Sequence, residues 1–289
     1  MNNNALQYAL EYARRGWYVF PCREKDSEPF WDDKIKCERV MGAKSPYTHS
    51  GFMEATVDEL KIKEWWMQYP EAAIGISCGH SNLAVIDIDI EDGKSGFDSF
   101  MTLNVVDTGA LHSLTPSGGM HIVFSGQTDS HAYHDIKIDI RSVGAYIVSP
   151  NSEILVNGSI KKYVAIDDWT RTPSTLPSNL IDKFDLLRGK DKKNNGKKYK
   201  GKESIEELLP RIWKALKKLP QNFCDDRFLW VSIGLALKSV GEEAYPLWDK
   251  WSMKSEKYHK EKNLYVWNNM KPKEITIASL FYYAKEFGE

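Results

Sequence analysis

Cysteine is scarce in this sequence, and no two cysteines form a C-x-x-C pair: they stand at Cys22, Cys37, Cys78 and Cys224. This spacing argues against a disulfide framework and against a zinc ribbon. Long apolar runs are also missing, because the longest uncharged one, residues 228–237, is far shorter than the about 20 residues of a membrane-spanning helix. Glu11, Arg14 and Arg15 interrupt the first apolar residues, so a signal peptide is not expected. We therefore expect a cytoplasmic protein with reduced thiols and no membrane partner.

Net charge is nearly absent, with a formal value of −1 over 289 residues, but the charges are unevenly distributed. Up to residue 187 there are 17 Lys and Arg against 26 Asp and Glu; after it there are 22 against 14, which gives −9 and +8. An acidic part can collect metal ions, whereas a basic part can meet phosphate. With 42% hydrophobic residues the chain can bury a core, which excludes a disordered or collagen-like protein.

A basic stretch, residues 188–202, connects the two parts and has eight Lys and Arg and three glycines. Such a segment cannot build a core, so we predict a flexible linker that separates a domain at 1–187 from a domain at 203–289. The linker is equally well read as a solvated spacer or as a strap that touches nucleic acid. A flexible linker would allow the second domain to move.

The hydrophobic pattern differs on the two sides of this linker. Before it we expect a helix at 5–15 and a second helix with a Thr56–Glu59 capping box, and then short strands at 73–77, 83–90, 121–125, 136–141 and 146–148. After it the pattern predicts helices only, near 203–219, 227–240, 244–251, 264–269 and 276–287. The sequence therefore predicts an α+β domain followed by a small all-α domain.

Two acidic residues share one face of the predicted strand at 83–90, which reads LAVIDIDI. Because side chains alternate along a strand, Asp87 and Asp89 point the same way, about 6.5 to 7 Å apart at their Cα atoms. From there two carboxylates can converge on two divalent ions about 3.5 to 4 Å apart. A D-x-D pair alone more often belongs to a half-buried strand whose two carboxylates face solvent.

Two further motifs follow this strand. In TPSGGMHIVF, the small residues Ser117, Gly118 and Gly119 form a turn whose backbone N–H groups can approach an anion, and His121 begins the next strand. In IKIDIR, Asp139 is a third carboxylate, and Arg141 shares its face and suits phosphate. Each motif alone is as easily a hairpin, a core histidine or a surface ion pair.

Together, the order D-x-D strand, S-G-G-x-H and h-D-h-R resembles the catalytic core of the archaeo-eukaryotic primase superfamily, and most closely its bifunctional primase-polymerase (prim-pol) domains from plasmids, phages and integrated elements. A-K-S-P at 43–46, W-W-M-Q-Y-P at 65–70 and A-I-G-I-S-C-G at 73–79 look like the family's approach to its D-x-D strand. The part after the linker resembles a helical primase C-terminal domain, through D-R-F-L-W-V-S-I-G-L-A-L-K from Asp225 and W-D-K-W-S from Trp248.

This resemblance implies an RRM-like mixed or antiparallel sheet flanked by helices, and a DNA-directed nucleotidyltransferase that starts and extends primers. It implies two divalent ions, Mg²⁺ or Mn²⁺, held by Asp87, Asp89 and Asp139. The triphosphate would meet Ser117, Gly118, Gly119, His121 and Arg141. Implied partners are single-stranded DNA, ribo- or deoxyribonucleoside triphosphates, and a helicase domain or helicase protein. For template contact we expect the lysines of the basic half: Lys192, Lys193, Lys197, Lys198, Lys214, Lys217 and Lys218.

The chain departs from the family pattern in two ways. The second motif is often S-x-H, but here Gly119 precedes His121 by two positions, which leaves a serine contact to Ser117. Some relatives carry a zinc-binding stem; pairs such as Cys78 with His80, or His131 with His134, are poor pieces of one, so zinc is not expected.

Two other functions compete with this interpretation. A nucleotide-sugar glycosyltransferase also uses D-x-D, but it leaves Asp139, the S-G-G-x-H motif and the basic half without a purpose. An inactive replication initiator or single-stranded DNA-binding module shares the basic half, but it does not need three aspartates. Metal-dependent nucleotide incorporation separates this last alternative from the enzyme.

Overall fold

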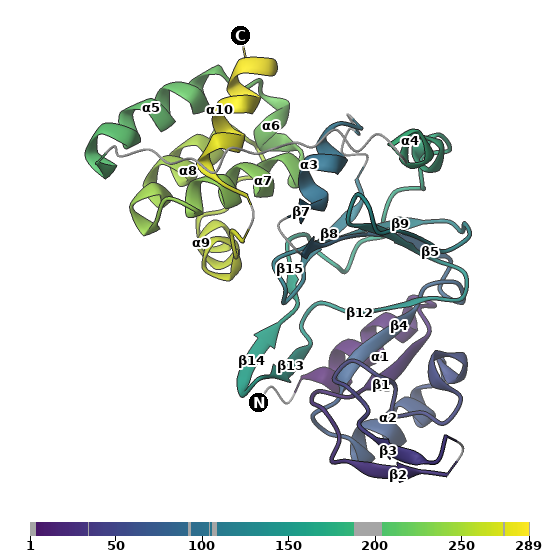
Figure 1. Ribbon diagram of the computed structural model, residues 1–289. Helices are drawn as coiled ribbons and strands as arrows, with labels where there is room; N and C mark the ends of the chain where they lie inside the picture. Colours follow the sequence, from purple (N-terminus) through teal and green to yellow (C-terminus); the bar gives the residue numbers. More distant parts are fainter. Residues whose placement is uncertain are drawn as a thin grey trace.

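We describe the fold from a computed structural model, which describes residues 4–33, 35–91, 94–103, 105, 109–187, 204–273 and 275–288. The predicted linker and its four candidate lysines, Lys192, Lys193, Lys197 and Lys198, lie outside these residues. Figure 1 shows mixed strands and helices in the N-terminal part (residues 4–187) and helices alone in the helical part (residues 204–288). The predicted α+β class with an all-α C-terminal region is confirmed.

A larger antiparallel sheet forms the centre of the N-terminal part. Its strand order is β10-β11-β5-β9-β8-β15. The strands are β5 (Leu83–Ile88), β8 (Leu111–Leu114), β9 (Met120–Ser125), β10 (His131–Tyr133), β11 (Ile138–Arg141) and β15 (Val164–Ala165). β5 lies between β11 and β9, so the strand that carries Asp87 has a neighbour on each side.

A smaller antiparallel sheet, with order β1-β4-β12, lies below the larger one in Figure 1. It consists of β1 (Val19–Cys22), β4 (Ala73–Ser77) and β12 (Tyr146–Val148), and it packs with α1 (Ala5–Arg14) and α2 (Glu59–Gln68) in one apolar cluster. Leu83, Val85 and Val123 of the larger sheet join this cluster. One face of the larger sheet therefore packs toward the smaller sheet.

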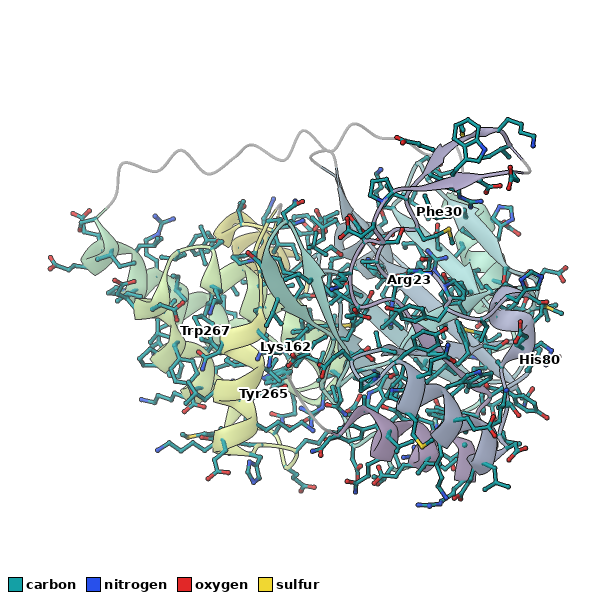
Figure 2. The ribbon with its side chains drawn as sticks, turned by 90° about the horizontal axis from the view of Figure 1, so that it is seen from below. Arg23, Phe30, His80, Lys162, Tyr265 and Trp267 are labelled. Atoms are coloured by element: carbon teal, nitrogen blue, oxygen red, sulfur yellow. The ribbon has the colours of Figure 1, made fainter. Side chains whose placement is uncertain are left out.

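Three two-stranded ribbons and further short elements complete the N-terminal part. The ribbons are β2 (Phe30–Asp32) with β3 (Cys37–Arg39), β6 (Ile90–Glu91) with β7 (Lys94–Ser95), and β13 (Glu153–Val156) with β14 (Ser159–Lys162). The helices are η1 (Gly51–Glu54), α3 (Gly96–Met101) and α4 (Leu180–Leu187). In Figure 2, Phe30 of β2 and Trp267 of the helical part lie at well-separated places in the molecule.

The second helix begins later than its sequence predicted. Asp58, not Thr56, is the N-cap of α2, and its carboxylate accepts hydrogen bonds from the backbone N–H groups of Leu60 and Lys61. Thr56 instead pairs with Val19 of β1 in an isolated bridge, so it belongs to the sheet edge. The Thr56–Glu59 capping box is therefore wrong. Carboxylates are strong N-caps, and here Asp58 competes successfully two residues later.

The helical part contains α5 (Ile205–Lys218), α6 (Asn222–Asp225), α7 (Arg227–Lys238), η2 (Glu242–Ala244), α8 (Tyr245–Ser252), α9 (Lys260–Asn269) and α10 (Ile277–Glu286). A capping box between Ser204 and Glu207 starts α5. The rings of Trp230 and Trp248 stack with centroids 4.5 Å apart, and Trp267 lies 5.5 Å from Trp248. These tryptophans are core residues, because each is at most 2% exposed. Among the described residues, no helix is both long and apolar enough to cross a membrane.

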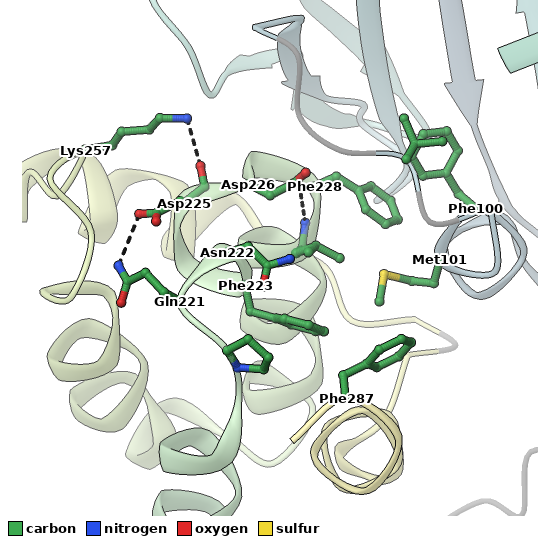
Figure 3. A pocket seen from close by; sticks show the side chains of 13 residues that line it. Phe100, Met101, Gln221, Asn222, Phe223, Asp225, Asp226, Phe228, Lys257 and Phe287 are labelled. Atoms are coloured by element: carbon green, nitrogen blue, oxygen red, sulfur yellow. Dashed lines mark hydrogen bonds between the residues drawn. The ribbon is translucent and has the colours of Figure 1, made fainter. Parts of the chain in front are cut away.

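The helical part shares a continuous apolar cluster with the second face of the larger sheet. Phe97 and Phe100 of α3 pack on Phe228 of α7, with ring centroids 5.3 and 4.6 Å away. A cavity of about 510 Å³ lies at this seam; Figure 3 shows Phe100 and Met101 on one side of it and Phe223 and Phe228 on the other. The two predicted domains are thus joined by buried contacts as well as by the linker.

Candidate active site

Four strands place polar side chains in one row across the larger sheet. In the antiparallel register, Asp139 of β11 pairs with Asp87 of β5, Asp87 pairs with His121 of β9, and His121 pairs with Ser113 of β8. Directly opposed residues point to the same face of a sheet. We call Asp139, Asp87, His121 and Ser113 the site row.

Arg141 neutralises the two carboxylates of the site row. Its Nε donates to Asp87 Oδ2 at 2.7 Å, and a terminal guanidinium nitrogen donates to Asp139 Oδ2 at 2.9 Å. Burial works to lower the pKa of Arg141, but the charges of Asp87 and Asp139 outweigh it and raise that pKa. Because one guanidinium contacts both carboxylates, Asp87 and Asp139 converge on a common cationic group.

Burial shifts the pKa values of Asp139 and His121 toward the neutral form of each side chain. Burial raises the pKa of Asp139, although the positive charge of Arg141 opposes the shift. Burial lowers the pKa of His121; Arg141 and Lys44 lower it further, while Asp87 opposes them. His121 is therefore a neutral imidazole near pH 7, with Nε2 3.4 Å from Asp87 Oδ1. Its Nδ1 is buried without a hydrogen-bond partner among the described residues.

Asp89 lies beyond the end of β5, which stops at Ile88. Its backbone N–H donates to Lys137 O at 3.0 Å, and the backbone N–H of Gly96 donates to Asp89 O at 2.9 Å. The charge of Asp89 contributes to the raised pKa of Arg141, so its carboxylate is near the other two. These backbone hydrogen bonds hold Asp89 beside the site row although it is not in the strand.

The S-G-G turn (residues 116–119) leads into β9 next to the end of β5. Thr115 and Ser117 share a hydrogen bond between their hydroxyl oxygens at 3.0 Å. Gly119 lies so close to Ile88 O that a Cβ at this position would clash with it. The S-G-G turn therefore contacts the strand of Asp87 through Gly119.

A cavity of about 320 Å³ opens on the site row. Asp87, His121 and Arg141 line it from the larger sheet, whereas Tyr146, Ile147 and Val148 line it from β12 of the smaller sheet. Other lining residues include Lys44, Phe52 and Tyr163. The cavity therefore lies where the two sheets separate, with charged groups on one wall and aromatic and aliphatic groups on the other.

Lys44 is a site residue that the sequence interpretation missed. It lines the cavity and adopts φ +74, a left-handed conformation that is uncommon for a residue with a side chain. Two hydrogen bonds hold it there: its N–H donates to Arg23 O at 2.8 Å, and the Tyr146 hydroxyl donates to its carbonyl at 3.3 Å. Strained residues of this kind cluster at functional sites. The only sequence signal was its place in A-K-S-P, among the flanking family motifs.

The other candidate lysines lie away from the site row. Lys214, Lys217 and Lys218 belong to α5, which packs against α8 and α10. Figure 1 shows α5 at the outer side of the helical part, far from β5. The structure does not bring these lysines to the cavity.

The carboxylates suit a hard divalent ion by their chemistry, because Mg²⁺ and Mn²⁺ prefer oxygen ligands. The convergence of Asp87 and Asp139 on one guanidinium, with Asp89 nearby, fits a cation at this place. In the described part of the chain, however, no three acidic, histidine or cysteine residues are yet arranged as a metal-binding group. Arg141 now contacts the oxygens that an ion would use.

Comparison with known proteins identifies the family. Residues 9–179 match the family "Bifunctional DNA primase/polymerase, N-terminal", and residues 212–284 match the family "Primase C terminal 2 (PriCT-2)". This chain belongs to the bifunctional DNA primase/polymerase family. The order of the two matches confirms the predicted arrangement of a prim-pol core followed by a primase C-terminal domain. The family supports a role in DNA replication.

Two viral proteins share shorter segments with the chain. It is 35% identical over 71 residues to "Putative helicase 121R" of Invertebrate iridescent virus 3, and 32% identical over 82 residues to "Putative helicase 022R" of Frog virus 3 (isolate Goorha). These segments cover 24% and 27% of this prim-pol chain but 8% of each relative. The chain therefore matches a small part of much longer proteins.

Proposed function

We propose that this prim-pol chain joins nucleoside triphosphates on a single-stranded DNA template, with release of pyrophosphate, and that it both starts and extends primers. The observation that carries the proposal is the site row, with Asp139, Asp87 and His121 in register beside a cavity between two sheets. The family match supports the same chemistry. A protein that only binds DNA has no need for this convergence of carboxylates.

In this proposal Asp87, Asp89 and Asp139 hold two divalent ions, Mg²⁺ or Mn²⁺. When bound, the ions lower the pKa of the attacking 3′-hydroxyl and neutralise charge on the triphosphate. Asp87 and Asp139 both pair with Arg141, and ion binding requires carboxylates in their ionised form. Arg141 is then free to pair with a phosphate oxygen instead.

The triphosphate lies against the S-G-G turn and His121. The turn offers small residues that allow close approach, and Ser117 offers a hydroxyl. A neutral His121 donates one N–H to a phosphate oxygen without needing a proton from solvent. Lys44 faces the same cavity and adds a positive charge, while Tyr146 and Phe52 offer an apolar wall to the nucleoside.

The helical part and the basic linker bind the template in this proposal. Lys214, Lys217 and Lys218 of α5, together with the linker lysines, would form contacts with template phosphates. A helicase domain or helicase protein is the expected partner, because the two viral relatives are named as putative helicases and are far longer than this chain.

The test is a synthesis assay with the full chain. Single-stranded DNA, with and without an annealed primer, is incubated with ribo- or deoxyribonucleotides and with Mg²⁺, Mn²⁺ or a chelator, and products are sized on a gel. We expect products from both templates that vanish with the chelator. DNA binding without any product under all conditions would contradict the proposal and favour an inactive initiator or single-stranded DNA-binding module.

A further inference from the structure

The helical part contacts the S-G-G turn through one loop. This loop, residues 270–273, follows α9, and the Lys271 ammonium donates a hydrogen bond to Pro116 O at 3.1 Å. The backbone of Lys271 also covers Gly118, because a Cβ on Gly118 would lie 2.9 Å from Lys271 O and 3.3 Å from Lys271 Cβ. The turn that leads to His121 is therefore in direct contact with the second domain.

The opposite side of the same turn rests on the strand of Asp87. Gly119 packs directly on Ile88 O, and Gly118 has φ +97, which L-residues rarely adopt. The Gly118 N–H donates to Thr115 O at 3.0 Å, which closes the turn. The S-G-G turn is thus held between β5 on one side and Lys271 on the other, with no room for a side chain at either glycine.

Buried contacts fix the position of Lys271. The preceding residue, Met270, is 3% exposed and packs on Gly234 of α7, where a Cβ would lie 2.6 Å from Met270 Cε. Helix α7 is anchored on the N-terminal part through Phe228 and through Arg227, whose Nε lies 3.4 Å from Asp167 Oδ1. Lys271 therefore approaches the turn from a rigid support, not from a free loop.

We infer that Lys271 is a positioning residue for the nucleotide: through Pro116 and Gly118 the helical part holds the S-G-G turn in the shape that receives the triphosphate. This inference rests on the proposed function and deepens it, because nucleotide affinity then depends on a residue of the second domain. The hydrogen bond to the Pro116 carbonyl supports the Lys271 ammonium against burial and the nearby charges of Lys161 and Lys273, which lower its pKa. The two parts also approach each other at Lys162 of β14 and Tyr265 of α9, which lie side by side in Figure 2.

The test compares Lys271→Ala with Lys273→Ala in the full chain. Both variants lose one positive charge from the same loop, but the hydrogen bond to Pro116 comes from Lys271. Three quantities are measured: the Kd of a fluorescent nucleoside triphosphate with Mn²⁺, the Kd of single-stranded DNA, and the hydrogen-exchange rate of the Gly118 amide. A third variant, Lys271→Arg, retains a donor.

We expect Lys271→Ala to weaken nucleotide binding about tenfold, which corresponds to one lost hydrogen bond from a charged donor. The Gly118 amide should exchange faster, and DNA affinity should not change. Lys273→Ala should match the wild type in nucleotide affinity and exchange, and Lys271→Arg should recover most of the affinity.

Three results would overturn the inference. The first is an unchanged nucleotide Kd and an unchanged Gly118 exchange rate in Lys271→Ala. The second is an equal loss of nucleotide affinity in Lys273→Ala, which would make charge alone responsible. The third is a loss of DNA affinity with a normal Gly118 exchange rate in Lys271→Ala, which would make Lys271 a template contact. A wild-type protein without nucleotide incorporation would count against the proposed function alone. In that case the exchange of Gly118 would still decide whether Lys271 holds the turn.

Discussion

The two faces of the larger sheet differ sharply around Asp87. On one face the register aligns Asp139, Asp87, His121 and Ser113; one residue further along the same strands, the opposite face aligns Ile140, Ile86, Ile122 and His112. The aliphatic face packs in one apolar cluster with α3, α4 and the helical part, while the polar face opens into the cavity. Alternation along strands therefore lets one sheet serve as core on one side and as site on the other.

The difference between the two faces predicts its largest contrast in activity between substitutions at two adjacent residues of β5, Asp87 and Ile88. Asp87→Asn should reduce nucleotide incorporation at least about a hundredfold, because a proposed metal ligand is lost. Its free energy of unfolding should stay within about 1 kcal/mol of the wild type, since Arg141 keeps Asp139 as a partner. Primer extension on a gel and urea unfolding measure the two quantities.

Ile88→Ala is the matched control on the opposite face. Ile88 is fully buried, so its truncation should cost about 2 to 5 kcal/mol of stability. At a temperature where the variant remains folded, incorporation should stay near the wild-type level. If Asp87→Asn retained incorporation while Ile88→Ala lost it in the folded state, the division between the two faces would be refuted.

The second prediction concerns His112, the one polar residue in the row of Ile140, Ile86, Ile122 and His112. His112 Nδ1 lies 2.7 Å from Asp167 Oδ2, and Arg227 of α7 joins them. Burial works to raise the pKa of Asp167, but hydrogen bonding by His112 and the positive charges of His112, Arg227 and Arg171 lower it to about 2. Against an unperturbed 3.8, this shift stabilises the fold above about pH 4 by about 2 kcal/mol.

Asp167→Asn should therefore lose about 2 kcal/mol or more of unfolding free energy at pH 7. Because the folded-state pKa is depressed, the advantage of wild-type protein over the variant should shrink as the pH falls from about 4 to about 2. Urea unfolding of both proteins over this pH range measures the difference. A difference in unfolding free energy that stayed constant down to pH 2 would show that the charge of Asp167 does not stabilise the contact between the two parts.

The third prediction tests the wall that faces the site row. Lys44→Ala should raise the KM for nucleotide about tenfold, because a charge in the cavity is lost. Lys44→Gly separates charge from backbone, since glycine accepts φ +74 without strain. Equal effects of both substitutions in steady-state kinetics would assign the role to the charge; a normal KM in Lys44→Gly would assign it to the backbone.

The smallest effect is expected far from both faces, on α5. Replacing Lys217 and Lys218 together with Ala should leave extension of a bound primer unchanged. The slope of log K against log salt for single-stranded DNA should fall by about 1.4, or about 0.7 for each lost phosphate contact. Fluorescence anisotropy at several salt concentrations measures the slope, and an unchanged slope would remove α5 from the template-binding surface.

Much of the site could be predicted because its residues follow strand periodicity. Asp87, Asp139 and Arg141 alternate with isoleucines, so their shared face followed from the sequence, and the structure places them in contact. The strands at 73–77 and 146–148 were predicted with the bounds that the structure shows. Local alternation was sufficient where a strand has one polar and one buried face.

The remainder depends on contacts between distant segments. Lys44 lies in a loop, where its place in A-K-S-P was the only sequence signal. Lys271 reaches the S-G-G turn from 155 residues further along the chain, and no local pattern marks it. Helix α3 has six residues, too few to show a helical period, yet Phe97 and Phe100 join the two domains. The apolar core that the two parts share was therefore not visible in the local pattern.

The most direct test of the central claim counts Mn²⁺ ions at the site row. Electron paramagnetic resonance measures Mn²⁺ bound to the wild type, to Asp87→Asn and to Ile88→Ala, each with a non-hydrolysable nucleoside triphosphate. We expect two ions in the wild type and in Ile88→Ala, and a loss of binding in Asp87→Asn. Equal Mn²⁺ binding by Asp87→Asn and the wild type would contradict the assignment of this row as the catalytic centre.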